Sequence, residues 1–101
     1  MPRFPTLQLA AFEDEPFMKL VVTIPALNEE KTIYQVVSGV PRDIVGISET
    51  EVIVVNDGST DDTVKEALRA GAIVITLPGK GGLGHVFRTG IERAMRRGAD
   101  I

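Results

Sequence analysis

The sequence has 101 residues, of which 44% are hydrophobic and 25% are charged, and its formal net charge is −3. This composition is typical of a folded globular domain, and the small negative charge argues against a dedicated nucleic-acid-binding protein. The absence of cysteine and the single histidine exclude disulfides, thiolate zinc sites, cysteine nucleophiles and multi-histidine metal sites. No apolar run approaches the ~20 residues that span a bilayer, so we expect a cytoplasmic protein without a transmembrane segment.

Residues 1–17 differ from the rest of the chain. They contain three prolines and the acidic cluster 13–15. Their apolar residues do not keep the spacing of a strand or of a helix over any long stretch. We therefore predict an N-terminal extension over residues 1–17, poorly ordered or lying on the surface, and an α/β domain over residues 18–101. Met18 directly precedes the first apolar run and resembles a natural protein start.

The first predicted unit is a strand followed by a helix. The β-branched run 20–24 indicates a buried strand that Pro25 ends. Asn28 is a candidate helix cap, with Glu29 and Glu30 in the first turn. Apolar residues at helical spacing then predict one buried helix face, made of Ile33, Val36, Val37 and Val40.

The next unit repeats this order. Residues 51–56 predict a second strand, and Ser59 with Asp62 resembles a capping box for a second helix. Gly71 is expected to end that helix. Its predicted buried stripe is Val64, Ala67 and Leu68. Residues 72–77 predict a third strand.

A glycine-rich loop at 78–84 leads into a third predicted helix, and residues 99–101 resemble the start of a fourth strand. The predicted buried face of that helix is Phe87, Ile91, Ala94 and Met95. Apolar strands alternating with amphipathic helices indicate a parallel sheet covered on both faces. We therefore predict a doubly wound, Rossmann-like α/β fold, truncated at the start of strand 4, whose first strand is left as an exposed sheet edge.

Ligands of open parallel sheets bind outside the carboxyl ends of the strands, where three loops carry candidate groups. Glu29 could accept hydrogen bonds from two ribose hydroxyls, or merely complement a helix dipole. Asp57 could accept from the imino N–H of a base, or merely belong to an Asp-Gly turn. Gly79, Gly81 and Gly84 fit the G-x-G-x-x-G spacing of dinucleotide-binding loops, although a flexible connection explains them equally well.

Three segments together resemble a known family. Residues 22–33, 54–63 and 82–90 are similar, in this order, to the motifs of family 2 glycosyltransferases, which have the GT-A nucleotide-diphospho-sugar transferase fold. The polyprenyl-phosphate branch, which is similar to dolichol-phosphate mannosyltransferase, resembles the chain most. The resemblance implies a nucleoside pocket lined by Pro25, Leu27 and Glu29, with Val55 and Asp57 meeting the base. Further nucleotide-binding residues that it implies are Ala26, Asn28, Gly58, Lys80, Gly82 and Gly84.

The implied reaction transfers a sugar from a UDP- or GDP-sugar to an acceptor such as a polyprenyl phosphate, at the cytoplasmic face of the membrane or in the cytoplasm. The family's acidic motif for Mg²⁺ or Mn²⁺ would follow Ile101. We therefore expect no catalytic residue, no firmly bound metal and no activity in this chain alone. Two alternatives stay open: a dinucleotide-binding oxidoreductase part, and a non-enzymatic interaction domain that pairs, with itself or a partner, through the exposed edge.

Overall fold

A computed structural model describes residues 18–79 and 81–101. Its three strands form one sheet, all parallel, in the order β1-β2-β3. The strands are β1 (Met18–Ala26), β2 (Ile47–Asn56) and β3 (Ile73–Thr76). The helices are α2 (Ile33–Ser38), α3 (Thr63–Arg69) and α4 (Gly82–Arg96). The predicted α/β fold with a parallel sheet is confirmed, whereas the extension predicted over residues 1–17 lies outside the described residues.

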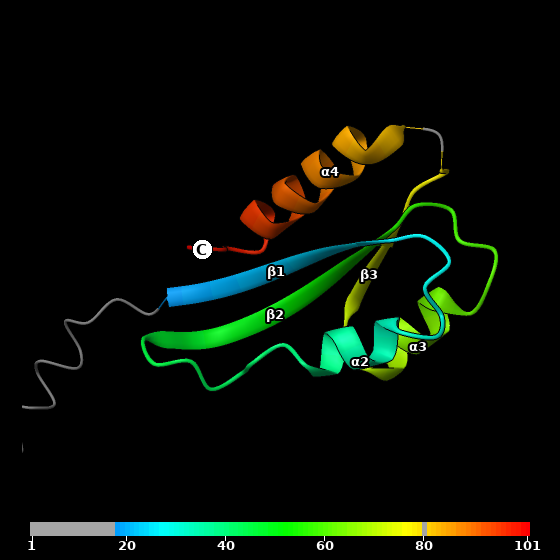
Figure 1. The fold of residues 1–101 in the computed structure, drawn as a ribbon. Coiled ribbons are helices and arrows are strands. Elements are labelled where there is room, and N and C mark those ends of the chain that lie inside the picture. The colour runs from blue at the N-terminus through cyan, green and yellow to red at the C-terminus, as the bar shows by residue number, and fades with distance from the viewer. Residues whose placement is uncertain (1–17, 80) are drawn as a thin grey trace, which may run out of the picture.

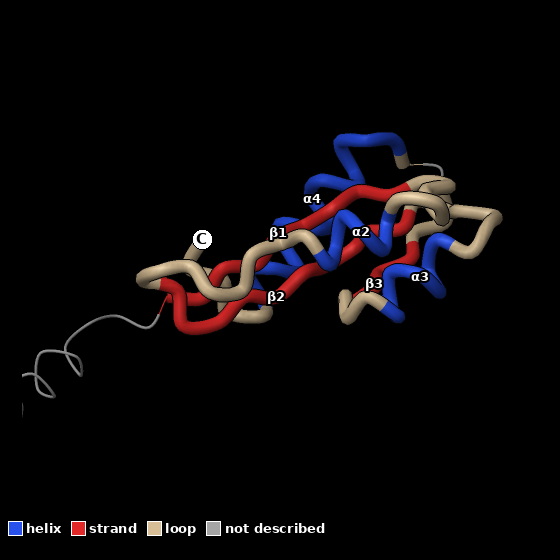
Figure 2. The backbone as a smooth tube through the Cα atoms, turned by 60° about the horizontal axis from the view of Figure 1, so that its bottom comes forward, coloured by secondary structure: helices blue, strands red, loops and turns tan. Residues whose placement is uncertain are grey.

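The two faces of β2 build two separate cores, because successive strand residues point to opposite sides. Val52 and Val54 join the cluster under α2 and α3, and Ile53 and Val55 join the cluster under α4. In Figure 1, α2 and α3 accordingly lie on one face of the sheet and α4 on the other. Figure 2 shows α2 and α3 next to one another in front of the strands. The sheet is therefore covered on both faces, as the continuous apolar strands predict.

The buried face of α4 differs from the prediction. Val86, Gly90 and Ala94 pack on the sheet, whereas the predicted core residues Phe87, Ile91 and Met95 are exposed. The reason is steric: a Cβ at Gly90 would lie 3.1 Å from the Cβ of Thr23. Small residues at 90 and 94 let the helix backbone approach the sheet, so the narrower side of the helix is the one that is buried.

The predicted helix starts are also wrong in detail. Asn28 does not cap α2, which begins at Ile33, but adopts a left-handed conformation with φ 54°. Ser59 does not cap α3 either, because Asp62 takes the N-cap position and makes no side-chain capping bond. Val36 and Leu68, predicted as core, are exposed. Gly71 follows the last turn of α3 with φ 94°, which confirms it as the end of that helix.

Residues 99–101 lie beside β1. The amides of Asp100 and Ile101 donate to the Lys19 carbonyl at 2.8 and 3.1 Å, and the Val21 amide donates to the Ile101 carbonyl at 3.0 Å. The segment thus takes the place predicted for the start of a fourth strand, and the edge predicted to be exposed is paired at Lys19 and Val21. Among the described residues, no helix has the length and hydrophobicity needed to cross a membrane.

Candidate functional site

A pocket of about 370 Å³ lies at the carboxyl end of the sheet, where the loops after all three strands meet (Figure 1). It brings together the predicted residues of the first loop with the predicted carboxylate of the second. Its lining residues are Pro25, Ala26, Leu27, Glu29, Asp57, Leu83 and Val86. Apolar walls with two carboxylates suit a flat ligand that carries hydrogen-bond donors.

Asp57 is fixed in the pocket by its backbone and left unmatched at its side chain. Its amide donates to the Ala26 carbonyl at 2.9 Å, which ties the loop to β1. Its Oδ1 atom is buried and has no hydrogen-bond partner among the described residues. An unpaired buried acceptor is unfavourable, so this oxygen is suited to a donor that a ligand supplies. The turn itself is made by Gly58, with φ 83°, and does not require the aspartate side chain.

Glu29 lies just before α2, whose first residue is Ile33. Its carbonyl accepts from the Ile33 amide at 2.9 Å and starts the helical hydrogen bonding. One carboxylate oxygen, Oε2, accepts from the Thr32 hydroxyl at 3.0 Å. The side chain is exposed and lines the pocket, where its carboxylate can accept from ligand hydroxyls.

Other predicted site residues lie around the pocket without lining it. Val55 is buried in the core beneath it. Gly58 packs against Gly79, since a Cβ at position 58 would lie 3.0 Å from the Gly79 Cα atom. Gly82 and Gly84 belong to the first turn of α4. Lys80 lies outside the described residues.

Leu83 and Val86 form the α4 part of the pocket lining. They are not among the site residues predicted from the sequence. Val86 shares its helix face with Gly90 and Ala94. The four-residue spacing of these three positions is the signal that places Val86 toward the sheet. A helix face of small residues would therefore have indicated which side of α4 meets the strands.

Side-chain hydrogen bonds fasten the first loop to the second. The Asn28 amide donates to Ser59 Oγ at 2.8 Å, and Asn28 Oδ1 accepts from the Thr60 amide at 2.8 Å. Glu30 makes a second exchange: its amide donates to Asp61 Oδ2 at 3.3 Å, and its Oε1 accepts from the Asp62 amide at 3.0 Å. Asn28, which is not the cap of α2, thus joins the two loops.

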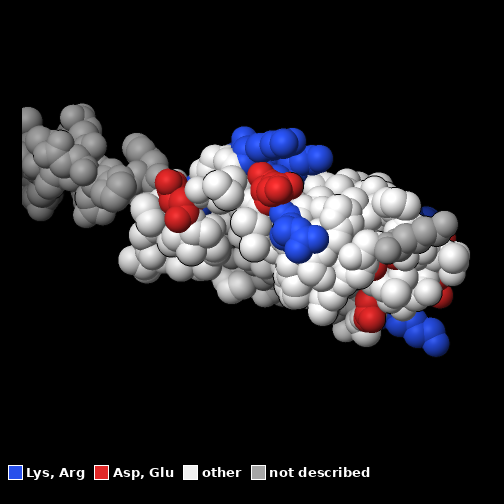
Figure 3. Space-filling model, turned by 90° about the horizontal axis from the view of Figure 1, so that it is seen from above, with Lys and Arg blue, Asp and Glu red and all other residues white. Residues whose placement is uncertain are grey.

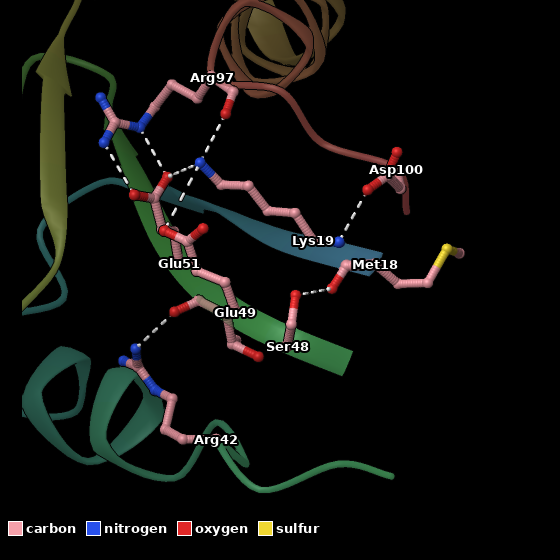
Figure 4. A network of polar contacts seen from close by, with 9 residues as sticks. Met18, Lys19, Arg42, Ser48, Glu49, Glu51, Arg97 and Asp100 are labelled. Carbon is pink, nitrogen blue, oxygen red and sulfur yellow. Dashed lines mark hydrogen bonds and ion pairs between the residues drawn. The ribbon is translucent and has the colours of Figure 1, made fainter. Parts of the chain in front are cut away.

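A charged network lies at the opposite end of the sheet (Figure 4). Arg97 donates to both Glu51 oxygens at 2.7 and 2.8 Å, and Lys19 Nζ lies 3.2 Å from the same carboxylate. The hydrogen bonds from Arg97, helped by Lys19, lower the pKa of Glu51 from 4.5 to about 2. Lys19 also donates to the Arg97 carbonyl, so the network holds the end of α4 against β1 and β2.

The outer surface of α4 is charged. Arg88, Glu92, Arg93 and Arg96 are exposed. Figure 3, which views the molecule from above, shows basic side chains gathered around acidic ones on this side. Mixed charges on an exposed helix are typical of a solvated face, as expected for these arginines.

No group of three or more His, Cys, Asp or Glu side chains in residues 18–79 and 81–101 is placed to hold a metal ion. A pocket at the carboxyl end of a parallel sheet has the usual ligand-binding position of an open α/β protein.

The family follows from comparison with known proteins. The family model described as Glycosyl transferase family 2 matches residues 21–97, which is most of the chain. The protein therefore belongs to glycosyltransferase family 2, as the sequence motifs predicted. This membership favours the glycosyltransferase over the dinucleotide oxidoreductase and interaction-domain alternatives.

Two curated relatives each match about half of the chain. Glucosyl-3-phosphoglycerate synthase of Mycobacterium tuberculosis H37Rv is 44% identical over 55 residues, which cover 54% of this chain and 17% of the relative. 4,4'-Diaponeurosporenoate glycosyltransferase of Staphylococcus aureus NCTC 8325 is 43% identical over 56 residues, which cover 55% of this chain and 14% of the relative. The matched region is thus a small share of either relative. Neither name mentions a polyprenyl phosphate, so the predicted acceptor gains no support from them.

Solved structures of the mycobacterial synthase share the fold. The crystal structure in complex with UDP aligns at a TM-score of 0.54 with 33% identity, covering 86% of this chain and 33% of the synthase. The structure with Mn²⁺, UDP and glucosyl-3-phosphoglycerate gives a TM-score of 0.53 at the same identity and covers 86% of this chain and 33% of the synthase. These similar proteins bind UDP, in the second case together with a divalent metal.

Proposed function

We propose that this chain forms the nucleoside-binding part of a glycosyltransferase that uses a nucleoside-diphosphate sugar as donor. The observation that carries the proposal is Asp57, whose buried Oδ1 atom has no hydrogen-bond partner in residues 18–79 and 81–101 and which lines the pocket between the first strand and α4. A nucleobase imino N–H is a donor of the right kind for that oxygen. The UDP complex of the mycobacterial synthase supports uracil as the base.

The remaining lining residues contact different parts of the ligand. Pro25, Leu27 and Leu83 offer apolar surface to the faces of the base and the sugar. The Glu29 carboxylate accepts the ribose hydroxyls, since it is exposed at the rim of the same pocket. Uracil and guanine both carry an imino N–H, so Asp57 fits either base and the apolar walls set the size that is accepted.

Several finer features belong to this proposal. The domain covers residues 18–101 and binds the donor in the cytoplasm. The complete enzyme uses Mg²⁺ or Mn²⁺, which accompany UDP in structures of the synthase; the described residues contain no group of three or more His, Cys, Asp or Glu side chains that could hold the ion. The acceptor remains the polyprenyl phosphate implied by the motifs. We expect the 101-residue chain to bind the donor nucleotide without turning it over.

The test is a titration of the chain with UDP, followed by amide chemical shifts. We expect saturable shifts at residues around the pocket, and we expect Asp57→Asn to weaken binding about tenfold, because a neutral amide oxygen replaces the charged acceptor of the imino N–H. Asp43→Asn is the matched control, with the same charge change at an exposed residue outside the pocket.

GDP and NAD⁺ are titrated in parallel. Tighter binding of GDP than of UDP would reassign the base and keep the nucleoside pocket. Equal UDP binding by the wild-type chain and Asp57→Asn would contradict the role of Asp57. Saturable binding of NAD⁺ alone would overturn the proposed function.

A further inference from the structure

Thr63 is the one residue of the second loop region whose polar side chain is fully buried at the start of α3, with 0% exposure. Its amide and its hydroxyl both donate to Asp61 Oδ1. A hydroxyl has one hydrogen to donate. Because that hydrogen is directed to Asp61, the lone pairs of Thr63 Oγ1 are left to act as acceptors.

The acceptor side of this hydroxyl faces the pocket loop. Thr63 Oγ1 accepts from the Glu29 amide at 2.8 Å. Glu29 is held on its other side as well, since its carbonyl accepts from Ile33 in α2. With both main-chain groups held, the direction in which the Glu29 side chain leaves the backbone is set by Thr63 on one side and by the helix on the other.

Asp61 fixes the donor-to-acceptor direction of this chain of hydrogen bonds. The hydrogen bond from Thr63 keeps the pKa of Asp61 below its ordinary value, so the aspartate is a carboxylate that can only accept. An accepting carboxylate strengthens the acceptor character of the hydroxyl that donates to it. The order Asp61, Thr63, Glu29 amide therefore has one direction and cannot invert.

We propose that Thr63 is a positioning residue for ligand binding: its buried hydroxyl fixes Glu29 at the rim of the pocket, so that the carboxylate meets the ribose hydroxyls. This inference rests on the proposed nucleoside-binding function and extends it to a residue that does not line the pocket. The methyl group of Thr63 is buried with the rest of the side chain, while the hydroxyl accepts from the loop. Two substitutions separate these roles: Thr63→Val keeps the volume and removes the hydroxyl, and Thr63→Ser keeps the hydroxyl and removes the methyl.

The first measurement needs no ligand. Hydrogen exchange at the Glu29 amide is followed by NMR in the wild-type chain and in both variants. We expect Thr63→Val to lose protection at this amide and Thr63→Ser to retain it. Should Thr63→Val fail to fold, Asp61→Ala tests the same chain of bonds from its exposed end, with a smaller loss of protection at Glu29.

The second measurement is the affinity for UDP. We expect Thr63→Val to weaken binding about five- to tenfold, the effect of one lost positioning hydrogen bond, and Thr63→Ser to stay within about twofold of the wild type. Val37→Ala is the control for stability: Val37 is as fully buried as Thr63, but it lies in the cluster under α2 and α3 and is not part of the hydrogen-bond chain. It should lower the unfolding temperature and leave UDP affinity unchanged below unfolding.

The inference is overturned if Thr63→Val keeps both Glu29 protection and UDP affinity. It is also overturned if Val37→Ala, at equal thermal stability, weakens UDP binding as much as Thr63→Val does. Failure of the wild-type chain to bind UDP has a different meaning: it contradicts the proposed function, and the exchange data alone then decide whether Thr63 holds Glu29.

Discussion

Gly90 of α4 lies directly against Thr23 of β1, at a distance that leaves no room for a side chain on the helix. A Cβ at position 90 would lie 3.1 Å from the Thr23 Cβ and 3.3 Å from its Cγ2. Both partners belong to regular elements, so neither can move without shifting its neighbours. This contact sets the separation between α4 and the sheet, and with it the α4 part of the pocket lining.

Gly90→Val should therefore destabilise the fold. Overpacking of this kind costs about 1–3 kcal/mol, and we expect a loss of unfolding free energy in that range by urea denaturation. Gly84→Ala in the same helix is the control, because a Cβ there would meet only the Arg88 side chain at 3.5 Å. Alanine forms helices more readily than glycine, by up to about 1 kcal/mol, so Gly84→Ala should not lower the unfolding free energy. A Gly90→Val protein as stable as the wild type would refute the close approach.

The contact between the second and third loops can be tested with a pair of glycines. Gly58 and Gly46 both have positive φ, 83° and 88°, so alanine at either position carries a conformational cost of about 1–2 kcal/mol. A Cβ at position 58 would lie 3.0 Å from the Gly79 Cα atom, whereas a Cβ at position 46 would have no atom within 4 Å. Gly58→Ala should lose more unfolding free energy than Gly46→Ala. Equal losses would show that the two loops do not touch.

Asn28 offers a test of the bond between the first two loops. Asn28→Gly keeps access to φ 54° and removes the side chain that accepts from Thr60. Its loss of stability should be about 1 kcal/mol, the net worth of one hydrogen bond. Asn28→Ala adds the cost of the left-handed conformation, and should unfold at a lower urea concentration than Asn28→Gly. The reverse order of the two midpoints would contradict the conformation assigned to this residue.

The loss of stability at acidic pH should depend on Glu51. Its pKa in the folded chain is about 2, against 4.5 when unperturbed. A carboxylate with a depressed pKa stabilises the fold above its unfolded pKa and loses this effect as the pH falls through the folded value. The unfolding temperature should thus fall between about pH 4.5 and pH 2, and Glu51→Gln should reduce the fall. A slope from Asp61 and Glu66, whose pKa values are also lowered, will persist.

Glu49→Gln is the matched control for this experiment. Glu49 belongs to the same strand and also faces Lys19, at 3.8 Å, but its side chain is 55% exposed against 18% for Glu51. Exposed pairs of this kind contribute little, so the pH profile of Glu49→Gln should follow the wild type. If both variants flatten the profile equally, the assignment to Glu51 is wrong.

The sequence predicts the sheet and the pocket mouth well because both depend on local patterns. The apolar run 51–56 lies within the observed β2, and Pro25, Leu27, Glu29 and Asp57 meet in one pocket because parallel strands end at a common edge. The resemblance of the motifs adds the family, which the family match confirms.

What the sequence misses depends on side-chain volume and on partners distant in the chain. Two stripes of α4 have the same spacing, one with Val86 and Gly90 and the other with Phe87 and Ile91. Hydrophobicity favours the second stripe, whereas contact with Thr23 selects the first. Asn28 and Ser59 have the composition of helix caps, but each finds its partner about thirty residues away. Local helix-capping propensity carries no information about hydrogen-bond partners that lie far away in the chain.

The fastening of the first loop also decides which end of a ligand can enter it. The successive amides of residues 28–30 donate to Ser59, Thr63 and Asp61. Main-chain amides in such a row can form a cradle for anions, but here they face protein oxygens instead. The loop presents the Glu29 carboxylate to the pocket, which Asp57 also lines. A molecule with hydroxyl and imino groups at one end and phosphates at the other must therefore enter with its uncharged end first, because this corner of the pocket repels the anionic one.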